Sequence, residues 1–206
     1  MKIAVIGGTG RVSTHFIRHA LSRGHEIKAL VRNIHKAEEM LEGAGLVQGD
    51  ARNQEDIRKT LTDCEVVFCG LSTDKSDTLT TAVPLLTDEM ERQSLKRLVT
   101  IGTAGILDSR FEDGKYRFES SESKRSKTFA AEEHAEVYQH LQKTTLEWTI
   151  VCPTYLPEGD VQGGVRFELD RLPEDGKKVT TGDTAVFAYQ TLINDQFMQK
   201  RVGICY

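Results

Sequence analysis

Short apolar runs alternate with amphipathic stretches along almost the whole chain of 206 residues. Compact β-rich runs predict strands, and apolar residues recurring every three or four positions predict helices. We expect strands at 2–6, 26–31, 46–49, 66–70, 97–101, 147–152 and 202–205. We expect helices at 11–23, 34–43, 53–62, 78–94, 127–144 and 183–194.

Several predicted strands are continuously apolar rather than alternating, including VVFCG (66–70), LVTIG (98–102) and WTIVC (148–152). This pattern is typical of parallel strands that helices bury on both faces. The repeated strand–helix order predicts an α/β fold, a doubly wound parallel sheet of the Rossmann type with helices on both faces. Gly24 is expected to end the first helix, and Thr181 or Asp183 to cap the last.

Two long polar segments interrupt this order, at 104–126 and 154–179, and the second is expected to contain a hairpin around LPEDGKK (172–178). Both follow strands, and ligands of open α/β sheets bind outside the carboxyl ends of the strands. We therefore expect a single domain over 1–206 with a small C-terminal substrate-side region. The alternative for residues 115–127 is a solvated loop.

The turn after the first predicted strand contains three glycines, Gly7, Gly8 and Gly10, followed by an amphipathic helix. In a dinucleotide-binding turn, glycine permits a tight bend and close approach of the backbone to a diphosphate, which the helix N-terminus then binds. Thr9, Arg11 and Val12 belong to the same predicted site, and Ser13 stands where such motifs have a third glycine. The alternative is a βα turn with a structural role only.

The end of the second predicted strand indicates which nicotinamide cofactor is bound. A carboxylate there would favour NAD(H), but the chain has Arg32 and Asn33. The planar guanidinium of Arg32 can pair with a 2′-phosphate, and Arg11 could assist it. We therefore expect NADP(H) rather than NAD(H), the alternative being that Arg32 is a surface arginine.

Polar and small residues follow the third and fourth predicted strands. Asp50 and Ala51 end the third, where the carboxylate could reach an adenine amino group or could instead cap the next helix. At the end of the fourth strand, Gly70, Leu71 and Ser72 are expected to border the middle of the cofactor.

Composition narrows the functional classes. The formal net charge of −4 gives no basic face for nucleic acid. The four cysteines show no zinc-binding spacing, so we expect no metal site, and no apolar run is long enough for a membrane span. We expect a cytoplasmic protein, monomeric or homodimeric, that acts on a small molecule.

The motifs VIGGTGRVS, ALVRN, VQGDARN, TIGTAG and LEWTIVCPTYL, with the late stretch VRFELDRLPEDGKKVTTGDTA, occur in an order and spacing that resembles a known group. That group is the atypical short-chain dehydrogenase/reductases, in the NAD(P)H-binding NmrA-like branch that includes flavin and biliverdin-IXβ reductases. The resemblance implies a substrate above the nicotinamide, between the segments at 104–126 and 154–179.

The resemblance also assigns roles on the nicotinamide side. It implies that Gly102 and the hydroxyl of Thr103 lie beside the nicotinamide and that Pro153 and Thr154 belong to the segment folding over it. His134 matches a histidine of the flavin-reductase-like members, with a structural hydrogen bond as the alternative role. Tyr155 stands where those members have a substrate-pocket histidine.

The sequence lacks the Tyr-x-x-x-Lys pair with which many short-chain dehydrogenases move a proton, because no tyrosine has lysine four positions later. Reduction of a flat conjugated acceptor, such as a flavin or quinone, is compatible with this absence. The alternatives are a non-catalytic NADP(H) sensor of NmrA-like type and, less favoured, an epimerase or dehydratase acting on a sugar nucleotide.

Overall fold

The computed structural model describes residues 1–73, 75–123 and 127–206. Its eight strands form one sheet in the order β3-β2-β1-β4-β5-β6-β8-β7, and every neighbouring pair is parallel except β7 with β8. This is the doubly wound order, with the direction of winding reversing between β1 and β4. The predicted Rossmann-type fold is confirmed.

The strands of the sheet match the apolar runs closely. They are β1 (Lys2–Ile6), β2 (Glu26–Val31), β3 (Gly45–Gln48), β4 (Val66–Cys69), β5 (Arg97–Ile101), β6 (Glu147–Pro153), β7 (Arg166–Leu169) and β8 (Lys200–Cys205). The α-helices are α1 (Arg11–Ser22), α2 (Ile34–Met40), α3 (Gln54–Leu61), α4 (Thr78–Arg92), α5 (Phe129–Leu141) and α6 (Thr181–Ile193).

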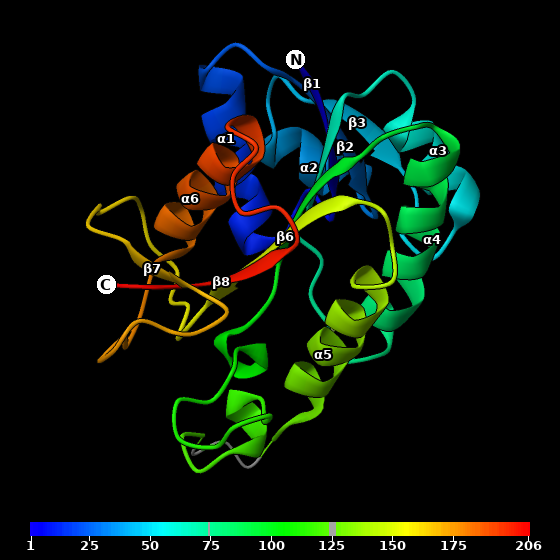
Figure 1. Ribbon diagram of the computed structural model, residues 1–206. Helices are drawn as coiled ribbons and strands as arrows, with labels where there is room; N and C mark the ends of the chain where they lie inside the picture. Colours follow the sequence, from blue (N-terminus) through cyan, green and yellow to red (C-terminus); the bar gives the residue numbers. More distant parts are fainter. Residues whose placement is uncertain (74, 124–126) are drawn as a thin grey trace.

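Helices cover both faces of the sheet (Figure 1). On one face α1 packs beside α6, and their apolar residues share a core with β1 and β2 that includes the stacked rings of Phe16 and Phe68. On the other face α3, α4 and α5 follow one another around a second core. Strands such as β5, buried at every position, therefore read as continuous apolar runs.

Two local predictions were wrong, and one strand was missed. No hairpin forms around 172–178, because β7 pairs antiparallel with β8 while Lys178 bridges to Tyr155 in parallel. The strand β7 itself was not predicted. The side chain that caps α6 is Thr180, which accepts from the Asp183 N–H, rather than that of Thr181 or Asp183. By contrast, Gly24 follows the end of α1 with φ +79°, as expected of a glycine at that position.

The segment after β5 contains two 3-10 helices, η1 (Ala104–Ile106) and η2 (Arg117–Glu119), which lie together below the sheet (Figure 1). The last three residues of the predicted 104–126 segment lie outside the described residues. In the part of the chain that the structure describes, no helix has the length and apolar character needed to cross a membrane, and no cluster of potential metal ligands occurs.

Candidate dinucleotide-binding site

The glycine turn lies at the point where the winding of the sheet reverses, between β1 and α1 and beside the end of β4. Gly7 has φ +79°, a conformation that favours glycine. A Cβ on Gly10 would lie 3.1 Å from the Gly70 carbonyl oxygen and 3.2 Å from that of Gly7. Glycine at position 10 thus lets three backbone segments meet with no intervening side chain.

The first turn of α1 is suited to an anion. Gly10 is its N-cap and supplies no capping side chain, and the first turn contains no acidic residue. The first N–H groups of a helix have no partner within the helix and carry its positive dipole end. A diphosphate is the kind of ligand that such an end binds.

A cavity of about 410 Å³ opens beside this turn, at the carboxyl ends of β1, β2, β3 and β4. Of the predicted cofactor residues, those that line it are Gly7, Thr9, Gly10, Arg32, Asp50, Ala51, Gly70, Leu71 and Ser72. The topology therefore gathers residues from four separate strand ends around one space, as an open α/β sheet requires for a nucleotide.

The cavity has a basic side that the sequence indicated only in part. Lys36 lines it together with Arg32, four positions earlier. Arg52 also lines it, but its guanidinium donates to the Ser76 and Thr78 hydroxyls at 3.0 and 3.1 Å and pairs with Asp77 at 2.7 Å. Lys36, Arg52, Ser76 and Thr78 were not predicted; the signal for Lys36 was its place in the first turn of the helix after Arg32.

Asp50 lines the cavity, as the predicted adenine contact requires, but it does not cap the next helix. The side chain that caps α3 is Asn53, whereas Asp50 accepts from the Arg52 N–H at 2.9 Å. The Asp50 N–H in turn donates to Asp56. The capping alternative is therefore wrong, and Asp50 forms a local turn on the wall of the cavity.

Three predicted residues do not line the cavity and have local structural roles instead. A Cβ on Gly8 would lie 3.0 Å from that of Ala29, so Gly8 is needed for packing against β2. Val12 is buried in the core below α1. Asn33 caps α2 by accepting from the Lys36 N–H.

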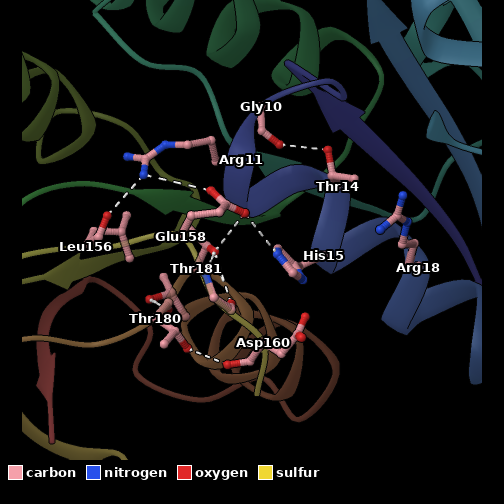
Figure 2. Close-up of polar contacts among 12 residues, drawn as sticks. Gly10, Arg11, Thr14, His15, Arg18, Leu156, Glu158, Asp160, Thr180 and Thr181 are labelled. Carbon is pink, nitrogen blue, oxygen red and sulfur yellow. Dashed lines mark hydrogen bonds and ion pairs between the residues drawn. The ribbon is translucent and has the colours of Figure 1, made fainter. Parts of the chain in front are cut away.

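Arg11 lies on the opposite side of the turn from the basic side of the cavity. It donates to the Leu156 carbonyl oxygen at 3.0 Å and lies 3.9 Å from the Glu158 carboxylate. Glu158 also contacts His15 and Thr181, both at 3.2 Å (Figure 2). This acidic side chain thus joins the start of α1 to the segment after β6 and to α6, and Arg11 does not line the cavity beside Arg32.

The predicted nicotinamide-side residues lie at the ends of β5 and β6. Thr103 caps η1, with its hydroxyl accepting from the Gly105 N–H at 3.3 Å. Gly102 packs against β6, because a Cβ there would lie 2.6 Å from Ile150 Cγ2. Pro153 is the buried last residue of β6. A cavity of about 140 Å³ brings Thr154 together with Ala104, Gly105, Arg117, Phe118, Glu122 and Ser123, so the two substrate-side segments meet.

The sequence predicts Thr103, His134 and Tyr155 as the catalytic residues, and these roles remain predictions. Neither His134 nor Tyr155 lines the two cavities described above. His134 lies within α5, and burial lowers its pKa to about 4, so its imidazole is neutral at pH 7. The side chain of Tyr155 is 65% exposed, while its carbonyl oxygen accepts from the Val179 N–H.

Arg201 of β8 connects the substrate-side segments to the sheet, a role that was not predicted. Its buried guanidinium donates to the Ile106 carbonyl oxygen at 2.5 Å and pairs with Asp108 at 2.7 Å and Asp170 at 3.2 Å. It also lies 4.3 Å from the centre of the Tyr138 ring. A buried arginine with these partners fixes the position of the segment that starts at Thr103.

The fold, the glycine turn and the cavity at four strand ends together define a Rossmann-type nucleotide-binding protein. A model of the NAD(P)H-binding family matches residues 7–195, and the chain belongs to that family. The predicted membership of an NAD(P)H-binding family is confirmed, and the protein is thereby a nicotinamide-dinucleotide binder.

Similar proteins cover different shares of the chain. Over 69 residues, or 33% of this chain, it is 40% identical to the photosystem II assembly factor Ycf39 of Cyanophora paradoxa, and it matches 22% of that relative's length. It is 26% identical to the uncharacterised YwnB of Bacillus subtilis, over 99% of this chain and 98% of that one. A structure assigned as an NADH-flavin reductase of Streptococcus pneumoniae superposes with a TM-score of 0.85 at 19% identity, covering 100% of this chain and 99% of the other, which shows a shared fold.

Proposed function

We propose that this protein is an NADPH-dependent reductase that passes hydride to a flavin, a quinone or a similar conjugated small molecule. The observation that carries the cofactor preference is the basic side of the larger cavity. Arg32 and Lys36 line it at the end of β2, where an NAD(H) site would have a carboxylate. Two cations there suit a 2′-phosphate dianion.

The residues of the site fit such a cofactor. The uncapped first turn of α1 would bind the diphosphate, Arg32 and Lys36 the 2′-phosphate, and the wall formed by Asp50 and Ala51 the adenine. The nicotinamide, when bound, supplies the hydride. The protein would hold the acceptor beside the nicotinamide in a reactive orientation. This positioning supplies the larger part of the rate enhancement in hydride transfer.

The acceptor side needs only modest chemistry from the protein. The space where the segments after β5 and β6 meet is bordered by Thr154 and Ala104, next to the Thr103 hydroxyl. That hydroxyl accepts from Gly105 N–H and keeps its own proton for donation. A reduced flavin or quinone can take its proton from this hydroxyl or from water, so the missing Tyr-x-x-x-Lys pair does not hinder the reaction.

A second candidate is a non-catalytic NADP(H) sensor. The cavity between the substrate-side segments is small, about 140 Å³, which is below the usual size of a site for a drug-sized ligand. The relative Ycf39 is a photosystem II assembly factor, so one similar protein has a role in assembly. In this case the bound cofactor would alter the surface offered to a protein partner.

Steady-state oxidation of NADPH, followed at its own absorbance with FMN and with a soluble quinone, tests the first proposal. We expect turnover above the rate without protein, and a lower rate with Thr154→Trp, which fills the space at the acceptor side. Thr145→Trp, at an exposed position between α5 and β6, is the matched control and should leave the rate unchanged. Tight NADPH binding with no turnover for either acceptor would contradict the reductase and favour the sensor.

A further inference from the structure

One edge of the sheet is open. Within the described residues β7 pairs with β8 alone, so no strand of that part of the chain lies along its other side. The Asp170 N–H donates to Arg201 across this pair, and main-chain groups in an antiparallel pair alternate in direction. The N–H and C=O groups of Phe167 and Leu169 therefore face outward, and they make no hydrogen bond with any residue in the described ranges.

Apolar side chains surround the outward groups on one face of β7. Phe167 is 51% exposed and Leu169 43% exposed, and both point to the same face because they are two positions apart. The Phe167 ring lies 5.8 Å from that of Phe187 on α6 and 5.1 Å from that of Phe197. A bare edge strand beside exposed aromatic rings is a surface suited to pairing with another strand.

We propose that this edge pairs with the β7 strand of a second copy of the chain, forming a symmetric dimer with one sheet continuing through both copies. Two antiparallel copies of a strand, related by a two-fold axis through Phe167, place Phe167 opposite Phe167 of the other copy. The two Phe167 residues then exchange both of their outward hydrogen bonds. Such a self-complementary contact is what a two-fold interface requires.

Charge complementarity favours this occupant and this register. With Phe167 on the axis, Arg166 of each copy stands opposite Glu168 of the other, on the face away from the aromatic rings. These are non-hydrogen-bonded pairs, in which side chains approach most closely. Within one copy Arg166 donates to the carbonyl oxygens of Glu174 and Tyr206, and Glu168 pairs with Arg110. The two Arg166–Glu168 pairs between copies therefore form between charged side chains that contacts within each copy already hold at the edge.

Analytical ultracentrifugation of the full chain tests the dimer and its charges. We expect a particle of twice 23.1 kDa at micromolar concentrations. Arg166→Glu or Glu168→Arg alone sets like charges opposite each other and should raise the dimer dissociation constant about 10-fold or more. The double reversal should restore dimerisation, whereas Lys143→Glu and Glu136→Arg, on the exposed surface near and on α5, should have no effect. A monomer of 23.1 kDa at all concentrations, or single reversals that leave the dimer intact, would overturn the proposal.

Cysteine cross-linking tests the register without relying on the charges. The four native cysteines are buried, so background cross-linking is low. Phe167→Cys places two thiols at a hydrogen-bonded pair with Cα atoms about 5.5 Å apart, within disulfide range. Leu169→Cys places its two copies about 13 Å apart along the strands, out of range. Oxidation should link the first variant and not the second, and equal linkage of both, or linkage of neither, would overturn the strand pairing.

Discussion

The Ser13 hydroxyl fills the space beside Gly70 that a side chain on Gly70 would need, so that a Cβ built there overlaps Ser13 Oγ. Ser13 is fully buried, and its hydroxyl has no hydrogen-bond partner among the described residues. Ser13 stands where dinucleotide-binding motifs have a third glycine, and Gly70 at the end of β4 leaves the space that its hydroxyl occupies. Helix α1 and the end of β4 approach closely through this complementary pair.

Gly70→Ala is expected to lower the free energy of unfolding by about 1–3 kcal/mol, because the added methyl group overpacks the contact with Ser13. Ser13→Ala removes a buried hydroxyl without a partner and should be neutral or stabilising by up to about 1 kcal/mol. The double variant should recover most of the loss. Urea unfolding of the four proteins measures the coupling, and strictly additive effects would contradict the contact.

The Glu158 carboxylate lies near the anion-binding end of α1 and holds Arg11 on the side of Leu156. Glu158→Gln should strengthen NADPH binding about 2- to 5-fold, because it removes an exposed negative charge close to a helix N-terminus. Calorimetric titration measures the change, and the gain should shrink at high salt. Glu136→Arg, on the exposed surface of α5, is the control. Weaker NADPH binding by Glu158→Gln would contradict this prediction and show that the carboxylate supports the site.

Asp183 links the start of α6 to the segment before β7 and to the end of the chain. The buried carboxylate accepts from the Tyr206 hydroxyl at 2.5 Å and from the N–H groups of Gln162 and Gly163 at 2.9 and 3.0 Å. Burial alone would raise the pKa of Asp183, but these hydrogen bonds outweigh it and hold the pKa below the usual 3.8.

A lowered carboxyl pKa stabilises the fold above the unfolded-state value, and this contribution is lost as the pH falls through the folded-state pKa. Asp183→Asn should therefore cost about 1–3 kcal/mol at neutral pH, and the difference from the parent should narrow below about pH 4. Urea unfolding between neutral and acid pH checks this. Asp175→Asn, at an exposed turn with φ +58°, should change little, and a pH-independent cost for Asp183→Asn would contradict the ionic contribution.

Elements with a strong local signal could be predicted from the sequence. The β1–turn–α1 unit is an apolar run, a glycine turn and an amphipathic helix in succession, and both elements begin where expected. The strand β7 is four residues long and polar on one face, and its pairing depends on β8, more than thirty residues later. No local pattern specifies such a pairing.

The candidate site likewise contains residues that could be predicted from the sequence and residues that could not. Gly7 and Arg32 were predictable because each stands directly after a strand, and Gly10 because it precedes a helix in a motif of fixed spacing. Arg52 and Thr78 reach the cavity only because the topology places the segments after β3 and β4 at the same edge of the sheet, with β2 and β1 between the two strands. Arg201 is an arginine inside an apolar strand whose partners come from three distant segments, so its role depends on tertiary structure.

Calorimetric titration with NADPH and with NADH measures whether the basic side of the larger cavity selects the phosphorylated cofactor. We expect tighter binding of NADPH, and a 10- to 100-fold loss for NADPH on Arg32→Ala with Lys36→Ala, about 1.4–2.7 kcal/mol, with NADH changed less than about 3-fold. Arg18→Ala with Lys143→Ala, both outside the cavity, is the matched control. Equal affinity for the two cofactors in the parent protein, or equal losses for both in the variant, would contradict the account.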